Sequence, residues 1–279
     1  MSNSKSPSPG PQRELFTAIV WALALLALLF FVLPTAALAI RTGELYAAAG
    51  SIMLEAIFSA LGLSLLTTLI SLGLIFVLGT AIAYAFTYFR FPLKSLLSVF
   101  IELPLVMPPV VAGLALLAAF GRRGLLGESL QIAGIALPFT PIAVVIAQVF
   151  VAAPFYIRAL QNRLAVIPHD LLESARMDGS SRYQVFARIL LPLSRRAMLS
   201  GLLLSWARAL GEFGATILFA GNLEGSTRTM PLLVYSALER DLGATYLSAA
   251  VLLALAALVF FAVRALTRLD SGDQDLSLR

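Results

Sequence analysis

The chain has 279 residues, of which 59% are apolar and only 13% are charged, and its mean hydropathy is +0.92. Soluble domains carry about 25% charged residues, so this apolar excess cannot be buried in one water-soluble core, and the composition indicates a membrane protein. The net charge of +5 then reflects basic residues kept on the cytoplasmic side and argues against nucleic-acid binding. The absence of cysteine excludes disulfides and thiolate metal sites, and His169 is the single histidine.

Long stretches without charge predict the membrane spans, because about 20 apolar residues in a helix cross the hydrocarbon layer. Residues 1–14, rich in serine and proline, are expected to form a disordered cytoplasmic tail, and residues 269–279 a second one. An all-α transmembrane domain is predicted over residues 15–268, with six spans at about 15–40, 60–88, 95–119, 135–157, 197–220 and 243–266. The first span begins like a signal peptide, but its apolar run is longer than a signal-peptide core, which favours retention as a helix.

The distribution of basic residues predicts that both termini are cytoplasmic. With the N-terminus inside, fourteen of the 20 basic residues fall on the cytoplasmic side and five on the outer side, in accord with the positive-inside rule. The pair Arg122 and Arg123 is the local exception. The chain is thus expected to be a multi-pass protein of the cell membrane.

A long polar loop at residues 158–196 separates the fourth and fifth spans. Asp170 and Glu173 have the spacing of a capping box, which predicts a short helix ending at the glycine corner Gly179. Ser181 and Gln184 have the same spacing and predict a second helix that runs into Pro192. The apolar residues of the first helix must be covered, either by the ends of the spans or by another protein; they are Leu171, Leu172, Ala175 and Met177.

The pattern within this loop resembles the EAA loop of the membrane subunits of ATP-binding-cassette (ABC) importers. The pattern consists of Glu173-Ser174-Ala175, Gly179 after three residues, and Ile189-Leu190-Leu191-Pro192 after nine more. All spacings agree, and the one departure is Ser174, where the family usually has alanine.

Two other stretches resemble the oxyanion branch of that family, which handles molybdate, tungstate and sulfate. Residues 208–216 (RALGEFGAT), followed by Thr227-Arg228-Thr229 and Pro231, carry the first resemblance. Residues 103–111 (LPLVMPPVV) and 121–128 (GRRGLLGE) are most similar to molybdate permease subunits. The resemblance implies translocation of an oxyanion, molybdate first and tungstate next, with sulfate or thiosulfate as the alternative substrate.

The resemblance also implies partners: a second copy of the chain, two ATP-binding subunits on the cytoplasmic side, and a soluble or lipid-anchored oxyanion-binding protein outside. The fold it implies is that of a type I ABC importer. The chain has no G-x-x-x-x-G-K-[ST] phosphate loop, so ATP and magnesium are expected on the partner, this subunit is expected to be neither an enzyme nor a cofactor carrier, and no metal site is expected. The residues implied in coupling to the ATPase are Asp170, Leu172, Glu173, Ser174, Ala175, Gly179, Leu191 and Pro192.

Arg208 and Glu212 lie one helical turn apart in the fifth span, where charge is costly unless paired or wetted. Two readings are open: Arg208 meets the oxyanion or gates its path, or the two residues form an internal ion pair that fixes helix packing. In the third span, Pro108 and Pro109 free backbone carbonyls and predict a kink, which is tolerated where the backbone lines a cavity, so this span is expected to face the pathway. Glu102 either lines that pathway or pairs with a neighbour.

Two other classes of protein are weighed against the importer. A secondary transporter acting alone needs coupling-ion ligands or inverted repeats, and neither is evident in the sequence. A membrane enzyme needs acid–base or metal groups within the spans, whereas His169 lies in the polar loop, where it is expected to be a surface residue.

Overall fold

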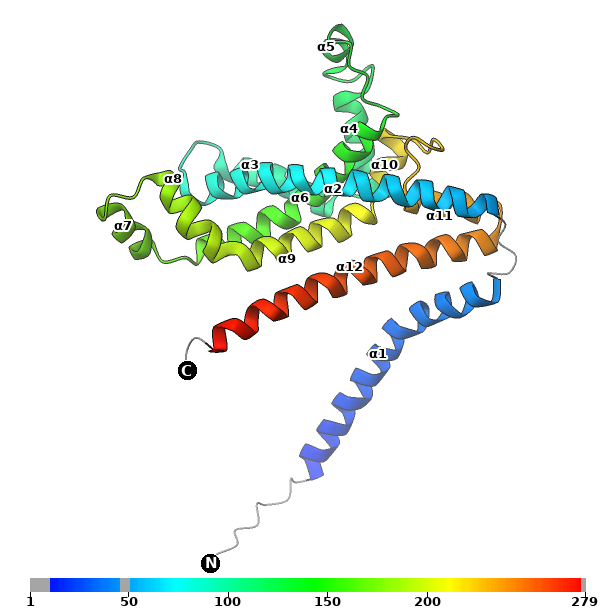
Figure 1. Ribbon diagram of the computed structural model, residues 1–279, viewed down its shortest axis with the longest axis horizontal. Helices are drawn as coiled ribbons and strands as arrows, with labels where there is room; N and C mark the ends of the chain where they lie inside the picture. Colours follow the sequence, from blue (N-terminus) through cyan, green and yellow to red (C-terminus); the bar gives the residue numbers. More distant parts are fainter. Residues whose placement is uncertain (1–10, 46–50, 277–279) are drawn as a thin grey trace, which may run out of the picture.

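A computed structural model describes the backbone of residues 11–45 and 51–276 and the side chains of residues 14–44 and 53–263. Helices form all the regular structure of these residues (Figure 1). The first half of the chain contains α1 (Pro11–Leu45), α2 (Ser51–Tyr88), α3 (Lys94–Val106), α4 (Pro109–Phe120), α5 (Gly127–Ile132) and α6 (Pro141–Ala165). The second half contains α7 (His169–Met177), α8 (Arg182–Val185), a π-helix (Phe186–Leu190), α9 (Leu191–Leu210), α10 (Gly214–Phe219), α11 (Met230–Leu238) and α12 (Leu242–Leu276).

Four of the predicted spans form helices that are long and apolar enough to cross a membrane within the described residues. They are Glu14–Glu44, Met53–Tyr88, Pro141–Ala165 and Leu242–Val263. The expected tails differ in part: residues 1–10 lie outside the described part, α1 already begins at Pro11, and α12 continues to Leu276.

The other two predicted spans are each broken near the middle. The third span is divided into α3 and α4 at Met107 and Pro108, because consecutive prolines cannot donate helical hydrogen bonds. The fifth span is divided into α9 and α10 at residues 211–213. The predicted fifth span therefore contains two helices, and the reason for the break is local: the carboxylate of Glu212 accepts a hydrogen bond from the backbone of the next helix.

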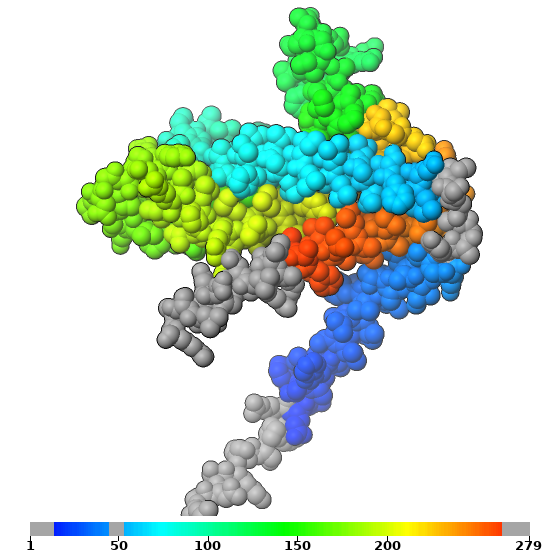
Figure 2. Space-filling view, viewed as in Figure 1, coloured from blue at the N-terminus to red at the C-terminus, as the bar shows by residue number. Residues whose placement is uncertain are grey.

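Three clusters of buried side chains hold the helices together. The largest joins α2, α6 and α9 and extends to Leu172 of α7 and Val185 of α8. A second joins α4, α10 and the first half of α6, and a third joins α2, α11 and α12. Helix α1 lies outside these clusters and runs away from the bundle (Figures 1 and 2). The C-terminal end of α1 contacts α12, where Thr42 Oγ1 donates to the carbonyl of Tyr246 at 3.1 Å.

The largest cluster depends on small residues around one buried ring. Tyr156 of α6 is fully buried, and its hydroxyl shares a 2.7 Å hydrogen bond with that of Thr80 on α2. A Cβ atom on Gly79 would lie 2.8 Å from Cδ1 of this ring, and one on Gly201 would lie 3.0 Å from Cβ of Ala159. Glycine thus permits α2 and α9 to approach α6 closely.

Replacement of Gly79 by alanine is expected to destabilise the folded chain by about 1–3 kcal/mol, because the added methyl meets a ring that is held in place by Thr80. Gly73 on the same helix has no atom within 4 Å of an added Cβ, so Gly73→Ala is the matched control. Thermal unfolding of the purified protein measures the difference. Equal melting temperatures for the two variants would contradict this packing.

Candidate functional site

The predicted coupling helix forms α7, which lies with α8 at one end of the molecule (Figures 1 and 2). The predicted capping box of Asp170 and Glu173 is wrong: Pro168 occupies the N-cap position and no side chain caps the helix. Proline takes this place because its φ is fixed and its ψ of 131° is extended. Asp170 lies inside the first turn, where its charge still favours the helix dipole.

The C-terminal end of α7 confirms the predicted glycine corner. Gly179 has a left-handed φ of +86°, its N–H donates to the carbonyl of Arg176, and the N–H of Ser180 donates to that of Ala175, each at 3.0 Å. This pair of bonds is the Schellman pattern that ends a helix at glycine. The second predicted capping box is also confirmed, since Ser181 N–H donates to Gln184 Oε1 at 2.7 Å and Gln184 N–H donates to Ser181 Oγ at 3.2 Å.

The two faces of α7 are covered differently. Leu172 is 4% exposed and belongs to the largest buried cluster, and Ala175 packs against that cluster. On the other face, Met177 is 83% exposed, and Glu173 and Ser174 are exposed as well. The inner residues pack on the bundle, and the outer face remains open within the described structure.

The connection from α8 to α9 is continuous, contrary to the expectation that the second loop helix ends at Pro192. Five residues of π-helix bridge the two helices, and Leu191 N–H donates to the carbonyl of Phe186. The wider turn accommodates Pro192, which cannot donate, at the start of α9. Leu191 packs against the largest cluster, whereas Pro192 is exposed.

The break between α9 and α10 contains the ion pair that the sequence spacing suggested. Nη1 of Arg208 lies 2.6 Å from Oε2 of Glu212. The Glu212 side chain is fully buried, and its Oε1 accepts from Ala215 N–H at 2.7 Å. The Arg208 side chain keeps 28% exposure. One carboxylate therefore neutralises the arginine and also caps α10.

The two broken spans meet at their breaks. A Cβ on Gly214, the first residue of α10, would lie 2.5 Å from Cβ of Pro109, the first residue of α4. A Cβ on Gly113 would lie 2.9 Å from Cβ of Leu218 and 3.0 Å from the backbone of Ala215. Glycine at these two positions therefore permits α4 and α10 to pack closely.

Glu102 does not join this site. It forms an ion pair with Arg158 of α6, which ties α3 to α6. Four of the predicted pathway residues lie in one region: Arg208 and Glu212 at the second break, and Pro108 and Pro109 at the first break, where Pro109 contacts Gly214. Glu102 is separate from them, because it pairs with Arg158 of α6.

Replacement of Gly214 by alanine is expected to separate the two breaks and to reduce transport strongly, because the backbone of α10 or α4 must move to admit the methyl group. Overpacking of this kind costs about 1–3 kcal/mol. Gly211→Ala is the control, since its Cβ would meet only the carbonyl of Ala207 at 3.5 Å. Substrate uptake and the melting temperature are measured for both, and unchanged uptake in Gly214→Ala would contradict the packing.

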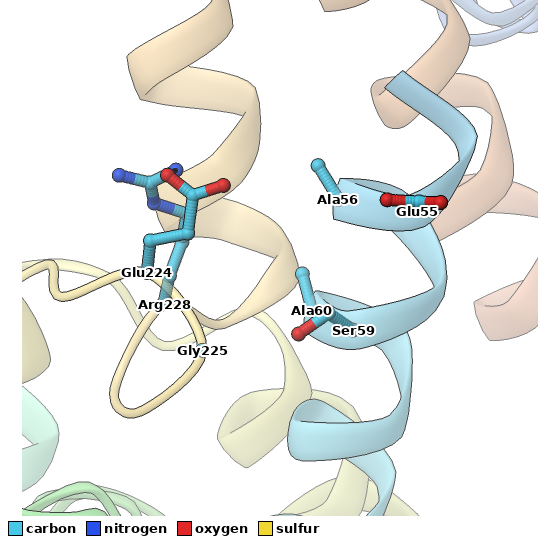
Figure 3. A pocket seen from close by; sticks show the side chains of 7 residues that line it. All are labelled: Glu55, Ala56, Ser59, Ala60, Glu224, Gly225 and Arg228. Carbon is cyan, nitrogen blue, oxygen red and sulfur yellow. Dashed lines mark ion pairs between the residues drawn. The ribbon is translucent and has the colours of Figure 1, made fainter. Parts of the chain in front are cut away.

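A polar cluster that the sequence reasoning left without a role lies at the opposite end of the molecule from α7, beside α11 and the start of α2 (Figures 1 and 3). Arg228 donates through Nε to Asn222 Oδ1 at 3.1 Å, and its Nη1 lies 3.1 Å from Glu224 Oε2. Asn222 in turn donates to Ser236 Oγ at 2.7 Å. The signal in the sequence was the run Thr227-Arg228-Thr229.

Comparison with known proteins defines the class of the chain. Residues 75–271 match the family described as the binding-protein-dependent transport system inner membrane component, and the chain belongs to this family. It is therefore a multi-pass membrane component of a transport system.

Several relatives are similar over most of the chain. The molybdenum transport system permease protein ModB of Mycobacterium tuberculosis is 39% identical over 250 residues, which cover 89% of this chain and 94% of ModB. The probable transport system permease protein NifC of Clostridium pasteurianum is 39% identical over 214 residues, covering 76% and 73% of the two chains. The sulfate transport system permease protein CysW of Synechococcus elongatus is 38% identical over 215 residues, covering 77% and 75%.

Solved structures agree on the fold. A chain of a bacterial alginate ABC transporter, in complex with a periplasmic protein bound to an alginate pentasaccharide, superposes with a TM-score of 0.70 at 16% identity. The match covers 92% of this chain and 95% of that one. A chain of the MetNI methionine ABC transporter, in an inward-facing conformation, gives 0.63 at 18% identity and covers 79% and 98%. The chain has the all-α transmembrane fold of type I ABC importers.

Proposed function

We propose that the chain is the permease subunit of an ABC importer that moves molybdate, and also tungstate, into the cytoplasm. The observation that carries this proposal is the 39% identity to ModB over nearly the whole length of both chains. The identity extends across the α7 loop and both helix breaks, so it covers the segments that coupling and passage require.

Coupling to a separate ATPase rests on the two faces of α7. The exposed face, with Glu173, Ser174 and Met177, is available to a partner, and the buried face is fixed to the bundle through Leu172. One buried cluster then extends from Leu172 to Ala209, the residue after Arg208. A push on α7 would move α2, α9 and the second half of α6 as one packed body, because well-packed cores do not deform continuously, and α6 must bend where its first half enters the other cluster.

The joint for that movement lies at the two breaks. On the far side of them, α4, α10 and the first half of α6 form a separate buried cluster. The inference is that access changes when the two clusters tilt about residues 107–108 and 211–213, with nucleotide on the partner favouring one arrangement. Arg208 and Glu212 hold the joint together, and their mutual neutralisation leaves a weakly polar passage that releases a dianion readily.

The assembly proposed is a homodimer with two ATP-binding subunits at the α7 end and a substrate-binding protein at the other, with both termini cytoplasmic. Helix α1 is available to lipid or to the second copy, since its apolar side chains, such as Trp21 at 71% and Phe30 at 72% exposure, are uncovered by the described chain. A hydrophobic helix of this length is stable only against lipid or another protein. ATP and magnesium would be bound by the partner subunits.

Sulfate is the second candidate substrate, because CysW is 38% identical over a similar share of the chain. The test uses cells that lack their own oxyanion uptake and express the chain with its ATPase and binding protein. Uptake of radioactive molybdate is expected, with competition by equimolar tungstate and none by equimolar sulfate. Uptake of labelled sulfate in preference to molybdate would contradict the assignment, as would uptake without the ATPase.

A further inference from the structure

Two cavities at the end of the molecule opposite α7 share Ala56, Glu224 and Arg228 among their lining residues, and Figure 3 shows the smaller of the two. One cavity, of about 240 Å³, is lined by Glu55 and Ser59 of α2. The other, of about 320 Å³, is lined by Met53, Arg240 and Asp241. The two cavities share the same arginine but differ in their remaining charges.

Hydrogen bonds and an ion pair within one loop hold the side chain of Arg228 in place. Its side chain is 16% exposed and is fixed by Asn222 and Glu224, and Asn222 is itself fixed by Ser236. The loop turns at Gly225, which has a left-handed φ of +71°, and Thr227 Oγ1 accepts from the N–H of Leu223 at 2.9 Å. An arginine oriented in this way loses little side-chain entropy when it binds a further group.

The larger cavity is less negative than the smaller one, because two arginines balance two carboxylates in it, whereas the smaller has one arginine and two carboxylates. Asp241 is engaged as the cap of α12, since its Oδ1 accepts from Gly243 N–H at 2.7 Å and lies 3.4 Å from Ala244 N. Arg240 has no ion pair among the side chains that the structure describes. In the smaller cavity, by contrast, the one charged residue besides Glu224 and Arg228 is Glu55, which is negative.

We propose that the cavity between Arg228 and Arg240 is an entry subsite for a tetrahedral oxyanion, with Glu224 as its displaceable counter-ion. The proposal rests on the function proposed above. The side chain of Glu224 is 72% exposed, and among the described residues its one ion pair is with Arg228, so its carboxylate can swing into solvent when an oxyanion takes its place on the guanidinium. Arginine suits this role because its planar donors match two oxygens of one anion.

Competition with Glu224 keeps the subsite weak. An exposed ion pair is worth little, so the oxyanion can displace the carboxylate, and the returning carboxylate helps the anion to leave. The subsite would therefore concentrate the substrate at the entrance without trapping it. This distinguishes it from the Arg208 and Glu212 pair, whose carboxylate is fully buried and is fixed by a backbone hydrogen bond.

The test exploits the absence of cysteine from the chain, because one introduced thiol is then unique in this subunit. Met53→Cys places the thiol in the cavity with Arg240, and Ser59→Cys places it in the cavity with Glu55. The rate at which an anionic thiosulfonate forms a mixed disulfide with this thiol, with release of a sulfinate, is measured on the assembled transporter, with the partner subunits free of reactive thiols, in the presence and absence of molybdate.

Molybdate is expected to slow labelling of Met53→Cys and to leave Ser59→Cys unchanged. In the Met53→Cys background, Glu224→Gln should lower the molybdate concentration for half protection by about two- to fivefold, the range that an exposed ion pair allows. Arg240→Gln, at an exposed residue, should raise it. The same pattern with sulfate in place of molybdate would assign the subsite to another oxyanion of the same shape.

No protection at Met53→Cys in a transporter that takes up molybdate would overturn the subsite and leave the proposed function intact. Equal protection at both thiols would also overturn it, because the effect would then be unspecific. Failure of uptake by the wild-type transporter would instead count against the proposed function, since the labelling assay requires no transport.

Discussion

Replacement of Gly179 by valine is expected to reduce ATP-driven uptake about tenfold or more while the permease still folds. A β-branched residue at a φ of +86° pays at least about 1–2 kcal/mol of backbone strain, and the chain relieves it by leaving the left-handed conformation. The bonds that end α7 are then lost, and α8 is redirected. Uptake of radioactive oxyanion in membrane vesicles, normalised to the amount of permease, measures the effect.

Gly179→Asn is the matched control, because asparagine tolerates the left-handed conformation and no atom lies within 4 Å of an added Cβ. Asparagine should retain most of the uptake. Measurement of ATPase activity distinguishes a defect in coupling from a defect in assembly. In the valine variant the ATPase should still bind the permease, but substrate-loaded binding protein should stimulate ATP hydrolysis only weakly. Equal uptake by the two variants would mean that the corner geometry is irrelevant to coupling.

Replacement of Glu212 by alanine is expected to cause the largest loss of stability of any single change at the helix breaks. The change leaves the guanidinium of Arg208 without its carboxylate and the N–H of Ala215 without its acceptor. Removal of one partner from a buried ion pair costs about 3–5 kcal/mol, which is a large share of the stability of a folded chain. Little folded permease should remain in the membrane, as measured by size-exclusion chromatography of the solubilised protein.

A double variant, Arg208→Met with Glu212→Gln, removes both charges while glutamine keeps an acceptor for Ala215. It should fold better than Glu212→Ala, because no charge is left uncompensated. Its uptake then distinguishes the two readings of the pair: retained uptake supports a structural pair, and folded but inactive protein supports a direct role of Arg208 toward the oxyanion. Wild-type stability of Glu212→Ala would contradict the ion pair itself.

Much of the fold could be predicted from gaps between charged residues, because the long uncharged runs correspond to α1, α2, α6 and α12. The sequence also located the two remaining spans, but it did not predict that each is divided into two helices. The paired prolines predicted a kink where the structure has the first break, since they cannot donate hydrogen bonds. The second break depends on how Glu212 turns onto Ala215, and a hydropathy pattern does not contain this information.

The loop shows the same limit at finer scale. Both capping boxes have the correct spacing, yet only Ser181 and Gln184 form one, because Pro168 takes the N-cap position ahead of Asp170. Gly179 was predictable, since its corner requires a conformation that few other residues adopt. The cluster around Arg228 was not predictable. Asn222, which fixes Arg228, is itself held by Ser236 on α11, and only the three-dimensional structure reveals how this helix packs.

The central claim is that the exposed face of α7 seats against a separate ATPase. The most direct test introduces Met177→Cys on that face, attaches a thiol-reactive photo-crosslinker, and irradiates the assembled transporter. Leu242→Cys, at the exposed start of α12 near the opposite end, is the control (Figure 1). A covalent adduct between the permease and the ATPase is expected from Met177→Cys alone. An adduct with the ATPase from Leu242→Cys, or none from Met177→Cys in an active transporter, would contradict it.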